Sequence, residues 1–314
     1  MTITSPIVLF VYNRPWHTRR TIEALQKNEL ALNSVLFIYS DEAKDEDARE
    51  GVDEVRAYID TIEGFKKVTV IERDKNWGLA NSIIDGVTRV VSEYGRVIVL
   101  EDDIVTSPYF LKFMNEALDF YQNKSKVWHV SGWNCAIETD GLEDVFLWRL
   151  MNCWGWATWA DRWEYYEKNV EKTIQEFSQQ EIKQFNLDGV EDFWIQVIQN
   201  KQGRINTWAI FWYATIFKQQ GLCLNPVQTF VENIGCDGSG EHCGSVDIYS
   251  NKLAVNLNKE IKFLSELNEN KIALERIKLF YKRQYTLFIS VIYKIVNKII
   301  NKFPIFKRGN KLWK

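Results

Sequence analysis

Apolar and polar positions alternate in blocks along the first 120 or so residues of the chain. Short, continuous apolar runs are typical of strands that are buried on both faces of a parallel sheet, and such runs occupy residues 7–12, 34–39, 68–71 and 96–100. Longer segments with apolar residues at helical spacing follow these runs, at residues 18–26, 44–62, 78–92 and 108–121. The alternation predicts an α/β fold, with a doubly wound, mostly parallel sheet and helices on both of its faces.

The pattern changes after residue 127 to segments that are rich in Trp and punctuated by Gly. It predicts helices over residues 170–185 and 191–200, and a strand or loop over residues 221–230. No internal repeat or low-complexity linker separates this part from the first, so we expect one continuous domain. The chain is therefore divided into a first half, a second half of the same domain and a C-terminal helical region, at residues 1–125, 126–262 and 263–314.

The C-terminal region combines an apolar helical face with basic residues. Residues 271–314 contain 12 of the 39 Lys and Arg residues of the chain but only one of its 42 acidic residues. Its uncharged run from Gln284 to Tyr293 is ten residues long, far short of the ~20 that a membrane-spanning helix needs. We predict an amphipathic helix that lies in the plane of an anionic membrane surface. Packing on the domain itself, or on the partner in a homodimer, is the alternative.

Tryptophan and cysteine usage adds to this picture. Many of the 13 Trp residues lie between Trp128 and Trp212, and their flat rings suit a sugar-binding cleft as well as a core. The five Cys residues are an odd number, and the N-terminus shows no secretory signal, so we expect reduced thiols in the cytoplasm. No recognised nucleic-acid-binding module accompanies the basic residues, so we expect no nucleic-acid partner.

Three adjacent carboxylates, Glu101, Asp102 and Asp103, directly follow the apolar run at 96–100. Ligands of open α/β sheets bind beyond the carboxyl ends of the strands, and the triplet occupies such a position. A divalent cation would relieve the mutual repulsion of these groups, and hard oxygen ligands favour Mg²⁺ or Mn²⁺, which also bridges the phosphates of a nucleotide. A solvated acidic turn is the alternative interpretation.

The sequence around the triplet, VIVLEDDIVTSPYFLKFM, resembles the metal-binding motif region of GT-A-fold glycosyltransferases. It is most similar to the N-acetylglucosaminyltransferase I type and to bacterial glycosyltransferases of surface-polysaccharide synthesis. The opening VLFVYNRP resembles the first nucleotide-binding strand of that fold, and RDKNWGLANS resembles the element that precedes the metal motif. The resemblance covers residues 5 to about 120 and continues more loosely to about 245.

The resemblance implies a role for each matching residue in the first half. Asp103 would bind the metal, Asp102 would face the ribose or a metal-bound water, and Glu101 would orient both. Further donor contacts would come from Asn13, Arg14, Asp41 and Asn81. A surface ion pair is the alternative for Arg14.

The second half supplies the expected acceptor side. Asp192, with Glu191 as the second choice, matches the family's general base, although acidic residues are also favoured at any helix N-terminus. Trp154 and Trp156 flank a Gly and would line the sugar pocket, or else fill the core. His242 lies in a Gly-rich segment that reads as a mobile loop, and it would be a further metal or diphosphate ligand.

Together these features predict a metal-dependent glycosyltransferase that uses Mn²⁺ or Mg²⁺. It would move a hexose or N-acetylhexosamine from a nucleoside diphosphate sugar, preferably UDP-linked, to a glycan or lipid-linked acceptor. We expect inversion of the anomeric configuration, and retention is the alternative. We place it on the cytoplasmic face of a bacterial membrane, in surface-polysaccharide synthesis. The alternatives are a sugar-1-phosphate nucleotidyltransferase, which would carry a Gly-rich loop after the first strand, and a non-catalytic carbohydrate-binding protein.

Overall fold

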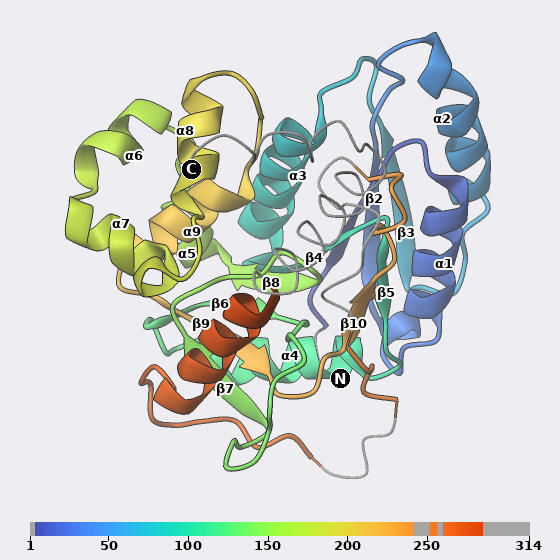
Figure 1. Ribbon diagram of the computed structural model, residues 1–314. Coiled ribbons are helices and arrows are strands. Elements are labelled where there is room, and N and C mark those ends of the chain that lie inside the picture. The colour runs from blue at the N-terminus through green and yellow to red at the C-terminus, as the bar shows by residue number, and fades with distance from the viewer. Residues whose placement is uncertain (1–3, 241–250, 256–259, 285–314) are drawn as a thin grey trace, which may run out of the picture.

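A computed structural model describes residues 4–240, 251–255 and 260–284 of the chain. One sheet of eight strands runs through this described part (Figure 1). The strands follow one another across the sheet as β3 (Lys67–Glu72), β2 (Val35–Ser40), β1 (Ile7–Val11), β4 (Arg96–Glu101), β8 (Trp156–Trp159), β6 (Val127–Ser131), β9 (Leu222–Pro226) and β7 (Val145–Trp148).

The sheet is parallel in the first half and mixed in the second. β3, β2, β1 and β4 are mutually parallel, whereas β8 runs antiparallel to both β4 and β6. β9 is again parallel to β6, and β7 closes the edge in the antiparallel sense. Because β8 joins β4 to β6, both halves of the chain belong to one continuous sheet, as expected. The boundaries at residues 125 and 262 stay predictions.

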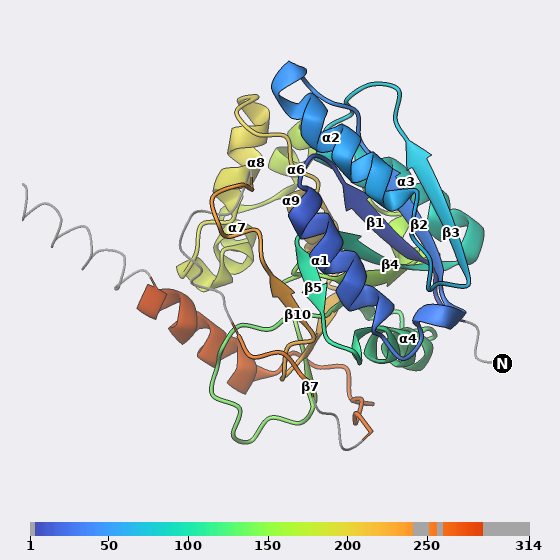
Figure 2. The same ribbon diagram turned by 90° about the vertical axis from the view of Figure 1, so that its right-hand side faces the viewer.

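Helices cover both faces of the parallel part. α1 (Pro15–Gln26) and α2 (Glu46–Ile59) lie on one face, and α3 (Leu79–Tyr94) lies on the other (Figure 2). α4 (Phe110–Tyr121) contacts β6 and β8. The predicted α/β fold, with a mostly parallel sheet and helices on both faces, is therefore confirmed.

The helices of the second half gather at one end of the sheet, on the left in Figure 1. They are α5 (Ala160–Trp163), α6 (Val170–Glu176), α7 (Gln179–Phe185), α8 (Trp194–Lys201) and α9 (Ala209–Lys218).

Two predicted helices of this half have different limits in the structure. The helix expected over 170–185 is broken, because Phe177 is extended and Ser178 caps α7, with reciprocal bonds between Ser178 and Glu181. The helix expected from residue 191 begins at Trp194.

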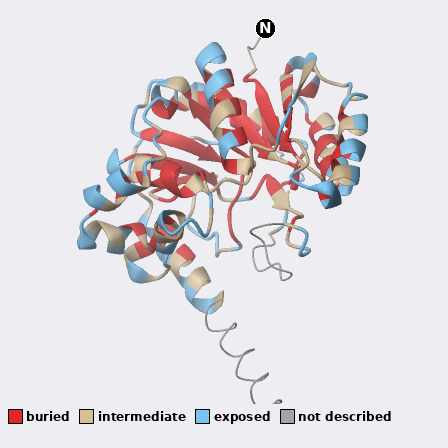
Figure 3. Cartoon of the chain, turned by 90° about the horizontal axis from the view of Figure 1, so that it is seen from above, coloured by how far each residue is buried: buried red, intermediate tan, exposed pale blue. Residues whose placement is uncertain are grey.

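The core follows the strands, as the buried residues in Figure 3 show. Every residue of β1, β6, β7 and β8 is buried. β1 and β7 are accordingly apolar throughout, whereas β6 also buries His129 and Ser131 and β8 buries Thr158. Aromatic rings make up much of the core of the second half. Trp156, Trp163, Trp208 and Trp212 form one contiguous group of rings. Much of the Trp content is thus used in packing.

Residues 271–284 are helical and lie against the domain. Ala273, Leu274 and Ile277 of this helix are buried, so the predicted C-terminal helical region begins as a docked helix. The amphipathic helix expected between 292 and 303 lies outside the described residues. Within the described part of the chain, no helix is both long and apolar enough to cross a membrane.

Candidate active site

The acidic triplet lies where β4 ends. Glu101 is the last residue of the strand, and Asp102 and Asp103 form the turn into β5 (Ile104–Thr106). The carboxyl ends of β1, β2 and β3 lie at the same edge, since these strands are parallel to β4. Asp102 and Asp103 are only 5% and 9% exposed and Glu101 is half-buried, so the triplet is not a solvated turn.

Arg14 contacts both aspartates from the start of α1. Its Nη2 donates to Asp102 Oδ1 and, at 2.8 Å, to Asp103 Oδ2, and its Nε donates to Asp102 Oδ2 at 3.3 Å. Nη1 is buried without a hydrogen-bond partner among the described residues. Only residues 12–14 separate β1 from α1, and no Gly-rich loop of the nucleotidyltransferase type lies between them.

Burial and mutual repulsion dominate the electrostatics of the triplet. Burial, reinforced by the charges of Asp103 and Asp102, raises the pKa of Glu101 to about 8. Burial also raises the pKa of Asp102 to about 6, against the lowering effect of Arg14. The pKa of Arg14 would fall through burial, but the two aspartates outweigh that effect and raise it. The group therefore favours a positive partner, which Arg14 supplies in this structure.

A second backbone segment lies directly over Asp103. β10 (Val231–Asn233) pairs with β5, and the Ile234 N–H donates to the Asp103 carbonyl at 2.9 Å. A Cβ added at Gly235 would lie 2.2 Å from Asp103 Oδ2, so any other residue there requires the Asp103 carboxylate or the segment to shift. Further along, Asp237 Oδ2 lies 3.0 Å from Nε2 of the buried His17 of α1.

The donor atoms of the triplet fit a cation that is shared with a ligand. The described residues contain no group of three or more His, Cys, Asp or Glu side chains able to hold a metal ion. Asp102 and Asp103 nevertheless offer adjacent carboxylate oxygens. Mg²⁺ and similar ions are commonly held by one or two carboxylates together with substrate phosphates. The residues thus suit a metal that arrives with a diphosphate better than one bound by protein alone.

Asp41, expected to contact the donor, acts in this structure as a clamp between two loops. Its Oδ1 accepts from the backbone N–H groups of Glu42 at 3.0 Å and Trp77 at 2.8 Å, and its Oδ2 accepts from that of Gly78 at 2.8 Å. Both oxygens are therefore engaged, and the clamp fixes the backbone where α3 begins. A contact between Asp41 and a nucleotide stays a prediction.

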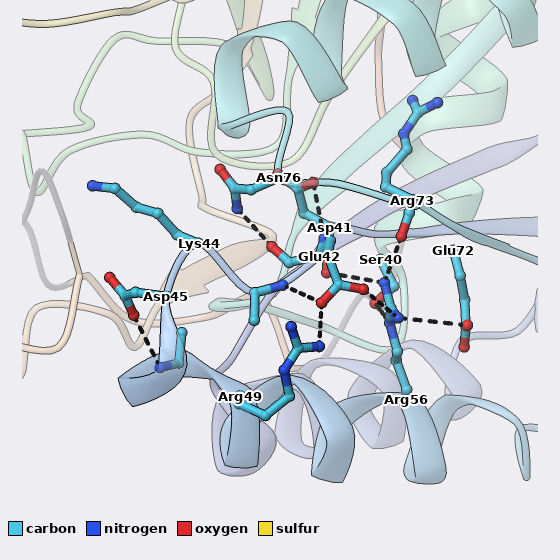
Figure 4. A network of polar contacts seen from close by, with 12 residues as sticks. Ser40, Asp41, Glu42, Lys44, Asp45, Arg49, Arg56, Glu72, Arg73 and Asn76 are labelled. Carbon is cyan, nitrogen blue, oxygen red and sulfur yellow. Dashed lines mark hydrogen bonds and ion pairs between the residues drawn. The ribbon is translucent and has the colours of Figure 1, made fainter.

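Charged residues extend this clamp beyond β2 and β3 (Figure 4). Glu42 pairs with Arg49 and, at 2.9 Å, with Arg56, which also donates to the Arg73 carbonyl at 2.9 Å. The Asn76 side chain donates to the Glu42 carbonyl at 2.7 Å. The loops at this edge of the sheet are thus held from both sides.

Asn13 and Asn81 are the other two residues that we expected to contact the donor. Asn13 is half-buried, and its carbonyl oxygen would be 2.5 Å from a Cβ at Gly51 of α2. Asn81 is exposed on the first turn of α3, where its amide donates to the Trp77 carbonyl at 2.8 Å. Asn13, Arg14, Asp41 and the triplet all belong to this edge, but no described contact joins Asn81 to the acids.

The expected base, Asp192, is exposed just before α8. Its Oδ1 accepts from the Ile195 N–H at 3.2 Å, in the manner of a helix cap, and from the Asn186 side-chain amide at 3.1 Å. Glu191 is half-buried, and burial raises its pKa. The capping role that any acidic residue can have at this position is therefore present, and the role as base stays a prediction.

The two tryptophans of the expected sugar pocket differ in environment. Trp156 is 1% exposed and stacks between His129 and Trp208, with ring centroids 5.4 and 5.0 Å away. This is the core-packing alternative, and it leaves no surface of Trp156 for a sugar. Trp154 is half-buried and meets Trp133 edge to face at 4.9 Å.

Other parts of the expected site lie elsewhere. His242 falls outside the described residues. A cavity of about 430 Å³ lies between residues 137–144, 227–230, 251–252 and 261, and none of the expected site residues lines it.

Sequence reasoning also missed Asn186 and Gly235, which contact the expected base and the expected metal ligand. A turn signal, Asn-Leu-Asp-Gly at 186–189, marks the first. Gly235 is one of several glycines in its segment, and no feature of the neighbouring sequence distinguishes it.

Three solved structures that the chain matches are distant in sequence. A mannosyltransferase, PcManGT from Pyrobaculum calidifontis in complex with GDP-Man and Mn²⁺, is 10% identical with a TM-score of 0.41, over 70% of each chain. An active-site mutant of LgtC is 7% identical with a TM-score of 0.36, over 67% of this chain and 70% of the other. S. aureus TarS is 15% identical with a TM-score of 0.29, over 40% of this chain and 21% of the other. Likeness at this level does not by itself establish a shared function.

Sequence comparison gives a match in the first half. A search of curated proteins finds no significant match, but the family model described as glycosyl transferase family 2 matches residues 7–133. This segment runs from β1 through β6 and includes Arg14, Asp41 and the acidic triplet. The resemblance to GT-A glycosyltransferases is thus confirmed for residues 7–133, which carry the sequence pattern of glycosyl transferase family 2.

Proposed function

We propose that the chain is a glycosyltransferase that uses a nucleoside diphosphate sugar as donor. One observation carries this proposal. Within the segment that matches glycosyl transferase family 2, the parallel sheet ends in two buried aspartates held by one arginine. Buried, opposed charges at the carboxyl edge of such a sheet suit a ligand that is itself charged and brings a cation with it.

The donor is proposed to bind between the acids and the clamped loops. Arg14 has a buried Nη1 without a partner among the described residues, so it has donor capacity left for a phosphate oxygen. Asp103 and Asp102 would hold Mn²⁺ or Mg²⁺ together with the diphosphate. Such a cation, when bound, neutralises the diphosphate and makes it a better leaving group. UDP is the proposed nucleotide, as the resemblance implies.

The acceptor side is proposed to carry the base. Asp192, or Glu191 beside it, would take the proton from an acceptor hydroxyl while that oxygen attacks the anomeric carbon and the diphosphate leaves. Attack from the face opposite the diphosphate inverts the anomeric configuration. A hexose or N-acetylhexosamine would pass to a glycan or lipid-linked acceptor, in the synthesis of a bacterial surface polysaccharide.

A donor screen tests this function directly. Purified full-length chain would be incubated with a panel of UDP- and GDP-linked sugars, with Mn²⁺ or with EDTA, and nucleotide release would be measured. We expect release from one or a few UDP-sugars with Mn²⁺ and a matching rise in melting temperature, because a ligand stabilises the folded state by mass action. Sugar binding without any release would favour the carbohydrate-binding alternative. Release of pyrophosphate from a nucleoside triphosphate and a sugar phosphate would favour the nucleotidyltransferase.

We also propose that residues 285–314 attach the enzyme to the cytoplasmic face of a membrane. The support is their sequence, which combines basic and apolar residues. Because residues 271–284 are docked on the domain, the informative truncation removes only 285–314. We expect the full chain, and not the truncated one, to sediment with vesicles that contain anionic phosphatidylserine. Sedimentation of both chains alike would contradict this assignment.

A further inference from the structure

A strained turn lies immediately before Glu191 and Asp192. Leu187, Asp188 and Gly189 have φ values of 48°, 58° and 86°, all in the left-handed region. This region is unfavourable for residues other than glycine, and such backbone persists only where its surroundings hold it. Leu187 is fully buried, which fixes the turn on its inner side.

Charged residues hold the turn on its outer side. Lys278 of the C-terminal helix places Nζ 2.7 Å from Asp188 Oδ2, and Arg149 places Nη1 3.1 Å from Asp188 Oδ1. Burial alone would raise the pKa of Asp188, but Lys278 and Arg149 lower it. The Lys278 side chain is 11% exposed and that of Asp188 36%, so the pair is partly shielded from solvent. Lys278 Nζ also lies 2.7 Å from Glu275 Oε1 on its own helix.

Arg149 also ties the start of the C-terminal helix to the sheet. It bonds Glu269 through Nη2 at 2.6 Å and through Nε at 2.7 Å. The Asn270 N–H donates to the Leu147 carbonyl of β7 at 2.7 Å. The helix at 271–284 is thus anchored before it reaches Lys278.

Asn186 connects the strained turn to Asp192. Its carbonyl accepts from the N–H groups of Gly189 at 2.9 Å and Glu191 at 3.1 Å. Its side chain donates to Asp192 Oδ1 at 3.1 Å and accepts from the Trp194 N–H at 2.9 Å. A change in the turn would therefore reach the carboxylate through one residue.

A ring contact joins the same two regions independently. Tyr281 of the C-terminal helix meets Phe193 edge to face, with ring centroids 6.2 Å apart. Phe193 directly follows Asp192, so the helix touches the acidic segment on both sides.

We propose that Lys278, with Arg149, is a positioning residue that sets the placement of Asp192 by holding the strained turn at 187–189. The helix at 271–284 is then a working part of the acceptor half, separate in role from the tail that follows it. The inference rests on the proposed function for its effect on turnover, but the positioning itself is a property of the folded chain.

Hydrogen exchange of the full-length protein tests the positioning. Lys278→Met keeps most of the side-chain volume and removes the charge, Lys278→Arg restores the charge, and Lys271→Met alters an exposed lysine on the same helix. We expect Lys278→Met to speed exchange at least ~10-fold in a peptide covering 186–196, since the amides of Gly189, Glu191, Trp194 and Ile195 are bonded there. Exchange in a peptide covering 96–106 should not change. Equal exchange in Lys278→Met and Lys271→Met would overturn the proposal.

Donor hydrolysis tests the consequence for turnover. With the UDP-sugar found in the screen and Mn²⁺, we expect Lys278→Met to lower kcat for nucleotide release about 10-fold without changing the Kd for UDP. Lys278→Arg should recover most of the loss, and adding Lys278→Met to Asp192→Asn should have no further effect, because both act through one carboxylate. A full additional loss in the double variant, or a weaker affinity for UDP, would overturn the positioning role. If the unaltered protein releases no nucleotide, the proposed function fails, and hydrogen exchange alone decides the positioning.

Discussion

The two acidic groups of the molecule are built in opposite ways. Asp102 and Asp103 are buried, 5% and 9% exposed, and both accept hydrogen bonds from the charged Arg14. Asp192 is exposed, and its described side-chain partners are the neutral amide of Asn186 and one backbone N–H. The first group is fixed by charge, and the second is fixed by backbone geometry.

The difference fits the two tasks that we assign to these groups. A diphosphate and its cation need preorganised charges that do not reorganise when the ligand binds. A base needs an oxygen that can still accept a proton, and no described residue donates to Asp192 Oδ2.

Replacing Asp192 should show most clearly that the two acidic groups have different roles. We expect Asp192→Asn to bind UDP with Mn²⁺ at the normal affinity but to lose ~10²–10⁴-fold in transfer, because general-base catalysis contributes about that much. Calorimetry and nucleotide release measure the two effects. Glu191→Gln is the matched comparison, and normal transfer by Asp192→Asn together with loss in Glu191→Gln would move the base by one residue.

Low pH should destabilise the folded chain, because the second half buries a neutral histidine. His129 is 0% exposed; its Nδ1 accepts from the Trp212 indole N–H at 3.2 Å, and its Nε2 donates to the Asn152 carbonyl at 2.9 Å. Burial lowers the pKa of His129 from 6.5 to about 3.

Between these values the unfolded chain binds the extra proton and the folded one does not, so the free energy of unfolding falls as the pH drops below 6.5. We expect a loss on the order of 2 kcal/mol from this group between pH 7 and pH 5. Urea unfolding at both pH values measures this loss. His129→Gln should flatten the dependence, and an unchanged slope would show that other groups cause it.

Adding one methyl group at Gly235 should weaken donor binding alone. Gly235→Ala would place a Cβ 2.2 Å from Asp103 Oδ2, and its φ is open to alanine, so the clash itself is what the variant tests. We expect about 10-fold weaker binding of UDP with Mn²⁺, or about 1.4 kcal/mol, from displacement of the carboxylate. Ser239→Ala, exposed on the same segment, should bind normally. Equal affinities of Gly235→Ala and the unaltered protein for UDP would contradict this prediction, because they would mean that the segment moves away from Asp103 without cost.

Much of the first half follows from local sequence. The apolar runs at 7–12, 34–39, 68–71 and 96–100 each match a strand to within one residue at either end. The inner strands β1 and β4 are buried and must therefore be apolar, whereas the edge strand β3 is only half-buried. The acidic triplet and Arg14 could be found for the same reason, since each directly follows such a run.

The second half depends on contacts that sequence spacing does not encode. The antiparallel insertion of β8 between β4 and β6 is a property of the whole sheet. Burial of Trp156 could not be distinguished from a sugar contact, because aromatic rings suit both. Lys278 and Asp188 meet only after the chain has folded, so no local pattern could have joined the C-terminal helix to the segment that carries Asp192.

The central claim is that Asp102 and Asp103 hold a donor diphosphate through a shared cation. Calorimetric titration of UDP into the full-length protein, with Mn²⁺ or with EDTA, tests it most directly when repeated on Asp103→Asn. We predict binding by the unaltered protein only with Mn²⁺, and at least ~100-fold weaker binding by Asp103→Asn, a loss of about 2.7 kcal/mol. Equal affinity in EDTA, or an Asp103→Asn variant that binds as tightly as the unaltered protein, would contradict the account.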